Sequence, residues 1–253
     1  MRCKVSFFLV TLAEAICIAG CAAYDLHPYE LEEGHAGATG VRTIAQLPLN
    51  LVIGLPDEFQ DASGRVERLI SSYLRKSGRE VSVVRLYEAR RLLASIDKGD
   101  SEDKDAVTRR FVERLRESRS FDAVVMPSLV YREGRARAVT HDVDWDGVTR
   151  KLVVQNEHQQ RMSLYYTADF AGKVPAVSLH LLVFSAPGER IFESYAGLDV
   201  VHEIDCATPG QAITARWRLR RHRLEDEHAL REGVALAFYP YLPLRPDFAD
   251  ESP

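Results

Sequence analysis

Ala176–Ser185 (AVSLHLLVFS) and Arg190–Ala196 (RIFESYA) are two largely apolar stretches joined by the four residues Ala186–Glu189 (APGE). Pro and Gly in so short a connection favour a turn. Aliphatic residues occupy every second position of the first stretch at Val177, Leu179, Leu181 and Val183. Because alternate residues of a strand face opposite sides of a sheet, this pattern predicts a β-hairpin with one buried face. Leu182 and Phe184 make the other face apolar further along, so we expect the second half of the hairpin to be covered on both sides.

Helical spacing of apolar residues is evident in three segments before the hairpin. The first segment starts at about Ser63, and Gly78 is placed to end it as a left-handed cap. Its apolar stripe consists of Val66, Leu69, Ile70, Tyr73 and Leu74. The second helix contains Ala89, Leu92, Leu93 and Ile96, and the third contains Val107, Phe111 and Leu115. After the hairpin, Leu224–Phe238 predicts a final helix that ends before Pro240, because Pro cannot continue a helix interior.

Three further segments are typical of strands. They are Leu49–Leu55 (LNLVIGL), Val81–Leu86 and Phe121–Tyr131, and Pro127 inside the last one suggests an edge position or a bulge. The order strand, helix, strand, helices, strand, hairpin, helix predicts a mixed α/β (α+β) fold. We expect a single mixed sheet flanked by helices, with a C-terminal hairpin and a terminal helix.

The start of the chain has the layout of an export signal. Arg2 and Lys4 precede an apolar run that is too short to span a membrane comfortably. The run ends in Ile18-Ala19-Gly20-Cys21, which resembles the lipobox of bacterial lipoproteins. The resemblance implies that signal peptidase recognises Ile18, Ala19 and Gly20, and that the Cys21 thiol and the new amino terminus are acylated. Ala22 resembles the residue that sends lipoproteins to the outer membrane of a Gram-negative cell, so we expect a lipid-anchored protein facing the periplasm.

The chain therefore divides into four parts. Residues 1–20 form a lipoprotein signal peptide, 21–46 a flexible tether, 47–240 a periplasmic mixed α/β domain with a polar insertion at 132–173, and 241–253 a C-terminal tail. The signal carries two basic and one acidic side chain, so its removal changes the formal net charge from −4 to −5. This mild acidity argues against a nucleic-acid partner. Cys206 is then the lone cysteine not acylated, and we interpret it as a buried thiol.

Two motifs resemble metal sites incompletely. Asp142, Asp144, Asp146 and Gly147 spell the start of a calcium loop, but Val153 stands where the closing acid belongs. Asp146-Gly147 also favours a hairpin turn, which is the interpretation we prefer. His202–Cys206 (HEIDC) is superficially similar to a zinc-protease helix but lacks the second His. We therefore assign no metal ligand, cofactor or catalytic residue, and predict that the protein is not an enzyme.

Five arginines form the strongest local charge: Arg216, Arg218, Arg220, Arg221 and Arg223. They precede Glu225, Asp226 and Glu227, so they could pair along a helix and form a solvated, self-compensated face. The alternative is a docking patch for anionic lipid headgroups or an acidic partner. We favour the first interpretation.

Several pieces of the chain resemble a group of envelope proteins: NLVIGLPD from Asn50, RVERLISSYLRKSGREVSVV from Arg65, FDAVVMPSLVY from Phe121 and LHLLVFSAPGERIFES from Leu179. Together they are similar to the periplasmic domain shared by the curli secretion lipoprotein, the amino-terminal domain of TolB and cell-wall-synthase activator lipoproteins. The resemblance implies a non-enzymatic component that contacts other envelope proteins, in some members as a homo-oligomeric ring. The alternatives are an oligomeric secretion-channel subunit, for which Lys151–Phe170 has only partial strand alternation, and a periplasmic metal-binding or hydrolytic domain.

Overall fold

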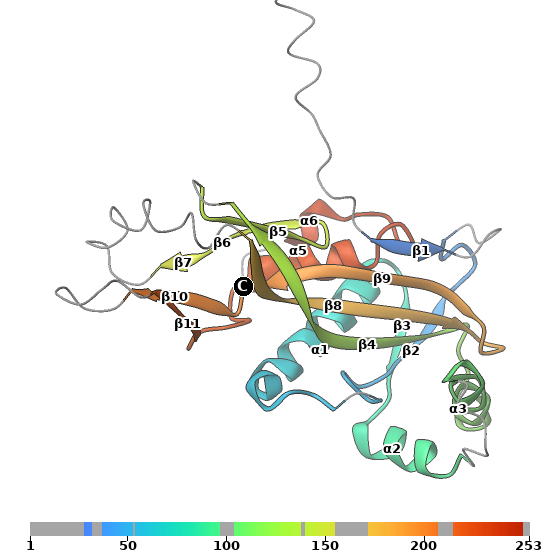
Figure 1. The fold of residues 1–253 in the computed structure, drawn as a ribbon. Helices are drawn as coiled ribbons and strands as arrows, with labels where there is room; N and C mark the ends of the chain where they lie inside the picture. Colours follow the sequence, from blue (N-terminus) through green and yellow to red (C-terminus); the bar gives the residue numbers. More distant parts are fainter. Residues whose placement is uncertain are drawn as a thin grey trace, which may run out of the picture.

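A computed structural model describes residues 28–31, 37–52, 54–96, 104–137, 140–154, 172–206 and 215–249. The predicted mixed α/β fold is confirmed: strands form a large curled sheet with helices packed against it (Figure 1). The main sheet has eight strands in the order β1-β9-β8-β4-β2-β3, with β5 paired to β4 and β6. Its strands are β1 Tyr29–Leu31, β2 Thr43–Gln46, β3 Glu80–Val83, β4 Ala123–Ala136, β5 Asp142–Trp145, β6 Val148–Lys151, β8 Lys173–Ser185 and β9 Arg190–Asp199.

A second, small sheet departs from the expected single sheet. Its strand order is β11-β10-β7, with bounds β7 Val153–Val154, β10 His202–Cys206 and β11 Ala215–Leu219. The helices are η1 Asp57–Phe59, α1 Gln60–Lys76, α2 Leu86–Ala94, α3 Lys104–Ser118, α5 Glu227–Ala237 and α6 Pro246–Ala249. Figure 1 shows α2 and α3 together at one end of the main sheet and the small sheet at the opposite end.

The predicted hairpin is confirmed as β8 and β9. Ser185 N–H donates to Glu189 O at 2.8 Å, and Gly188 has a φ of 89° that favours glycine. The four alternating aliphatic residues are fully buried in the core under α1 and α5. On the other face, Phe184 is buried and Leu182 half-buried against α2 and α3. The second half of the hairpin is therefore covered on both sides, as its apolar pattern predicts.

The three predicted helices before the hairpin are confirmed as α1, α2 and α3. Helix α1 ends as expected, because Gly78 has a φ of 78° and its N–H donates to Arg75 O at 2.9 Å. The final helix is confirmed as α5, which begins later than expected, at Glu227. The Asp226 carboxylate caps α5 by accepting a hydrogen bond from Ala229 N–H.

The prediction of a strand at Leu49–Leu55 is wrong. The strand is instead β2, at Thr43–Gln46, which lies between β3 and β4 in the main sheet. Residues 28–31 and 37–46 therefore belong to the folded domain, and for these residues the tether interpretation is wrong. The apolar pattern gave the wrong position because β2 has only two aliphatic residues. The apolar residues that follow it, Leu47, Leu49 and Leu51, are buried in the core although they do not belong to a strand.

Pro127 causes neither a bulge nor an edge strand. Strand β4 lies inside the sheet, and its register with β8 continues without a shift through the pair Pro127 and Leu181. On the opposite side of β4, beyond the end of β2, Asn50 forms hydrogen bonds with the β4 backbone. Its N–H donates to Pro127 O, its side-chain amide donates to Leu129 O, and its side-chain oxygen accepts from Leu129 N–H. Asn50 has a φ of 53°, which Asn tolerates better than most residues. The proline is accommodated because no strand needs its missing N–H.

The C-terminal tail is also part of the core as far as the structure describes it. Tyr241, Leu242 and Phe248 are buried, and the Phe248 ring packs edge-on against Tyr73 of α1 with centroids 5.0 Å apart. The Tyr73 hydroxyl donates to Pro243 O at 3.0 Å. Residues 241–249 thus close the apolar face of α1, and for these residues the prediction of a C-terminal tail is wrong.

Candidate functional site: an arginine groove and an open sheet edge

The small sheet brings together HEIDC and part of the arginine run, which are separate motifs in the sequence. Its antiparallel register places Glu203 opposite Arg218 and Asp205 opposite Arg216. His202–Cys206 is therefore a strand, not the helix of a zinc protease. The expected pairing of the arginines along a helix is also wrong, because they lie on β11 and the segment that follows it, before α5. For Arg218, the cross-strand residue Glu203 takes the place of a helical neighbour.

A groove of about 470 Å³ opens beside this sheet. It is lined by Val153, Glu203, Arg218, Arg220, Arg221 and His222. Among the described residues, the lining thus has three guanidinium groups and one carboxylate. Its size is within the range of small-molecule sites, on the order of 300–1,000 Å³. We call it the arginine groove.

Arg220 is held by a buried carboxylate behind the groove. Its Nη1 lies 2.9 Å from Asp199 Oδ1 and also donates to Val200 O. Asp199 Oδ2 accepts from the N–H of Leu224, a fully buried residue with a φ of 54°. Burial raises the pKa of Asp199, and the hydrogen bonds from Leu224 and Arg220 oppose that rise. Asp199 therefore fixes both an arginine and a strained backbone turn at the groove.

The other two arginines are more open. The Arg218 side chain is 44% exposed, and its Nε lies 4.0 Å from the buried carboxylate of Glu203. Arg221 is exposed and makes no hydrogen bond or ion pair within the described part of the chain. The groove therefore presents positive charge outward, with its acidic groups at the back.

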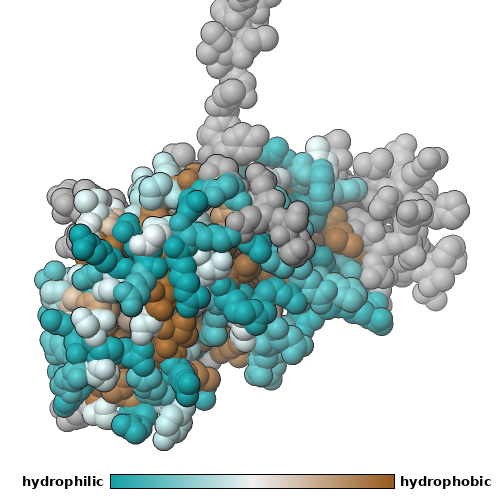
Figure 2. All heavy atoms as spheres, turned by 180° about the vertical axis from the view of Figure 1, so that it is seen from behind, coloured by the Kyte–Doolittle hydropathy of each residue, from teal (hydrophilic) through white to brown (hydrophobic). Residues whose placement is uncertain are grey.

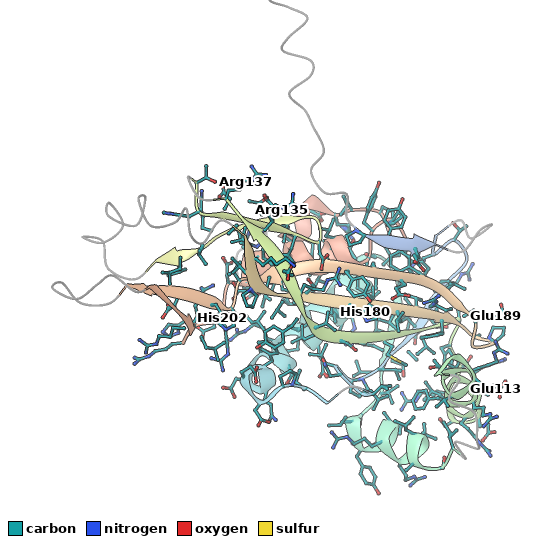
Figure 3. The ribbon with its side chains drawn as sticks, in the orientation of Figure 1. Glu113, Arg135, Arg137, His180, Glu189 and His202 are labelled. Atoms are coloured by element: carbon teal, nitrogen blue, oxygen red, sulfur yellow. The ribbon has the colours of Figure 1, made fainter. Side chains whose placement is uncertain are left out.

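Arg223 follows the groove residues, donates to Arg220 O, and connects this segment to the main sheet through Glu58. Arg223 donates to the backbone oxygen of Glu58 at 2.7 Å, and the Glu58 carboxylate accepts from the Tyr131 hydroxyl at 2.7 Å. The Tyr131 hydrogen bond holds the pKa of Glu58 below its ordinary value, and burial raises the pKa of Tyr131 to about 12. His202, the first residue of β10 and labelled in Figure 3, has a pKa lowered by burial.

The polar insertion contains the predicted hairpin turn. Strands β5 and β6 flank Asp146 and Gly147, with φ values of 37° and 80°, which fits the type of turn preferred in two-residue hairpins. The three aspartates of the calcium-loop alternative each have their own basic partner: Asp142 with Lys151, Asp144 with Arg137 and Asp146 with Arg132. Among the described residues, no cluster of three His, Cys, Asp or Glu side chains could hold a metal ion.

The main sheet also carries a polar network that the sequence did not predict, on the face away from α1 and α5. Arg132 binds Asp146 through two nitrogens and lies over the Tyr195 ring at 4.6 Å. Tyr195 stacks on His180 with centroids 4.3 Å apart, and His180 Nε2 lies 2.9 Å from Glu193 Oε1. Burial lowers the pKa of His180, and the hydrogen bond with Glu193 only partly opposes this shift. Alternation in β8 predicted that His180 faces away from the core, but the sequence contained no signal for its partners.

One edge of the main sheet is open and partly apolar. Strand β3 is the last in the strand order, so one side of its backbone pairs with no other described strand. Val83 is 46% exposed, and the following Leu86 and Tyr87 are 43% and 77% exposed. We call these three residues with β3 the β3 edge. Figure 2 shows apolar surface on the face opposite to that of Figure 1.

The sites at the chain start lie outside the described residues. These are the lipid-attachment residue Cys21 and the recognition residues Ile18, Ala19 and Gly20. The Cys206 side chain and residues 155–170, which carry most of the partial alternation, also lie outside them. Within the part that the structure describes, none of the helices has the length and apolarity to cross a membrane.

No protein-family model matches the chain, and no curated protein matches it. The resemblance to the curli secretion, TolB and synthase-activator group therefore stays a prediction.

Proposed function

We propose that the chain is an outer-membrane-anchored periplasmic lipoprotein that acts without catalysis, as a binding and scaffolding component of an envelope assembly or export system. The observation that carries the binding role is the β3 edge. An open strand edge offers backbone N–H and C=O groups to another chain, and exposed apolar residues beside it favour protein contact. Neither lysine nor proline blocks the strand Glu80–Val83, although both are common protections of such edges.

The anchor is supported by the basic start, the apolar run and the four-residue lipobox resemblance together. Several acyl chains at ~0.8 kcal/mol for each buried CH₂ would hold the chain firmly to a membrane. Replacement of Cys21 by Ala should abolish labelling with a radioactive fatty acid and release the protein from membranes. A variant that is still labelled contradicts the lipoprotein proposal.

Site-specific photo-crosslinking in cells tests the binding role. A photoreactive amino acid replaces Tyr87 at the β3 edge in the full-length chain, and the adducts are identified by mass spectrometry. The control position is Leu244, which is 47% exposed and precedes α6. Figure 1 shows α6 on the opposite side of the main sheet from α2, which carries Tyr87. Adducts with a defined set of envelope proteins at position 87, and not at position 244, support the proposal. Equal adducts at both positions contradict it.

The second candidate is an oligomeric secretion-channel subunit. The same edge favours it, because β3 of one copy can pair with β1 of the next, the strand at the other end of the strand order, and such head-to-tail contacts can close into a ring. Mass photometry of the protein extracted in mild detergent distinguishes the two functions. A large discrete assembly that crosslinks only to itself through position 87 favours the channel subunit, whereas a monomer crosslinked to other proteins favours the scaffold.

A further inference from the structure

The arginine groove has the chemistry of a ligand site that is separate from the β3 edge. From its lining and charge, we infer that the groove binds a small organic phosphate, either a soluble phosphate ester or the phosphate of a lipid headgroup. This inference does not depend on the proposed protein contacts, because the groove lies at the small sheet and the β3 edge belongs to the main sheet.

The charge of the groove selects an anion. In the part of the lining that the structure describes, Arg218, Arg220 and Arg221 outnumber the one carboxylate, that of Glu203, which is buried behind Arg218. Asp199 lies behind Arg220 and holds its guanidinium in place through a 2.9 Å ion pair. A guanidinium that is already fixed loses little side-chain freedom on binding a ligand.

The number of guanidinium groups favours phosphate over carboxylate. A single arginine can satisfy both oxygens of a carboxylate, whereas a phosphate ester has three or two free oxygens that several arginines can share. Arg221 adds an exposed guanidinium with no ion pair among the described residues, so it is available to a ligand. Three arginines around one groove therefore match a phosphate group better than they match a carboxylate.

The size and one wall of the groove favour an organic phosphate over the inorganic ion. The volume of about 470 Å³ is far larger than a single phosphate ion requires, and small-molecule sites are of this size. Val153, which is 38% exposed, provides an apolar surface beside the arginines. The ligand thus carries an apolar or neutral body next to its phosphate.

Isothermal titration calorimetry on the full-length chain in a non-ionic detergent tests the inference. The probes are glycerol 3-phosphate, and micelles that contain a small fraction of either phosphatidic acid or phosphatidylcholine. Arg221→Gln and Arg218→Gln should each raise the Kd for the phosphate probe about tenfold, since a hydrogen bond to a charged group is of that strength. Arg90→Gln removes the same charge from an exposed position on α2 and should leave the Kd unchanged.

The outcomes separate the two sources of phosphate. Tight binding of glycerol 3-phosphate without preference for phosphatidic acid micelles identifies a soluble ester, and stronger binding to phosphatidic acid micelles than to the soluble probe identifies a lipid headgroup. The inference is overturned if no phosphate probe binds, if Arg90→Gln weakens binding as much as Arg221→Gln, or if acetate competes as well as glycerol 3-phosphate. Circular dichroism of each variant shows whether the fold is retained. Arg218→Gln and Arg221→Gln must both raise the Kd for the phosphate probe, and a folded variant of either that binds normally contradicts the inference.

Discussion

The main sheet and the small sheet are stabilised in different ways. Strands β4 and β8 pair over 13 residues between two apolar layers, and the alternating side chains of β8 are fully buried. Strands β10 and β11 pair over five residues, in which acidic residues lie opposite arginines. Burial thus sets the register of the main sheet, because a shift of one residue would expose its core side chains. In the small sheet, charge pairing and the contacts of Asp199 contribute to the arrangement, and they leave cationic groups at the surface.

The largest expected difference between the two sheets concerns side-chain truncation. Leu179→Ala removes a fully buried side chain from the main core and should lower the free energy of unfolding by about 2–5 kcal/mol. Leu219→Ala removes a side chain that is 36% exposed on β11 and should cost less than about 1 kcal/mol. Urea denaturation of both variants measures the difference. Equal losses would show that the small sheet is as strongly packed as the main core.

Removal of Asp199 should disturb the connection between the sheets. Asp199→Ala leaves Arg220 without its carboxylate and the buried Leu224 N–H without its acceptor, so we expect a loss of about 2–3 kcal/mol in unfolding free energy. Asp199→Asn keeps an acceptor oxygen and should cost less. Chemical denaturation compares the two variants, and a larger loss for Asn than for Ala would contradict this account of Asp199.

Two aspartates should give opposite dependences of stability on pH. Hydrogen bonds from the backbone of Thr43 and Arg42 lower the pKa of Asp122, so its contribution to stability is lost as the pH falls through its folded-state pKa. Burial raises the pKa of Asp199, so the folded state holds that proton more tightly and stability falls as the pH rises from the ordinary pKa of 3.8. The effect of Asp122 should be below about 1 kcal/mol, because this carboxylate is exposed.

Denaturation over the acidic range measures these slopes. Asp122→Asn should remove the loss of stability at the most acidic pH, whereas Asp199→Asn should remove the loss on raising the pH from about 4. Identical changes in slope for the two variants would contradict the assigned pKa directions.

The smallest expected effect is the coupling between Glu203 and Arg218 across the small sheet. A double-mutant cycle with Glu203→Gln and Arg218→Gln should give a coupling of about 0.5 kcal/mol, because the carboxylate is buried while the arginine is half-exposed. The control is Glu133 with Lys173 on the main sheet, where both side chains are mostly exposed and the coupling should be close to zero. A larger coupling for the control pair would reverse the contrast between the sheets.

Local pattern was sufficient for much of the fold. The helices α1, α2, α3 and α5, the β8–β9 hairpin and the Asp146-Gly147 turn follow from apolar spacing and turn chemistry. Strand β2 could not be predicted, because its place in the sheet depends on β3 and β4, which are distant in sequence. The role of Asn50 beside Pro127 likewise depends on a contact between residues 77 positions apart along the chain.

The fold class, the helices and the hairpin follow from the amino-acid sequence alone, because those features depend on the periodicity of neighbouring residues. The sequence also contains the lipobox resemblance, whose consequence for the anchor stays a prediction. The tertiary structure was needed to show that HEIDC pairs with the strand that carries Arg216 and Arg218, and that Asp199 lies behind Arg220. The physical reason is that cross-strand pairing and burial join residues far apart in sequence, and the pattern of either segment alone contains no information about its partner.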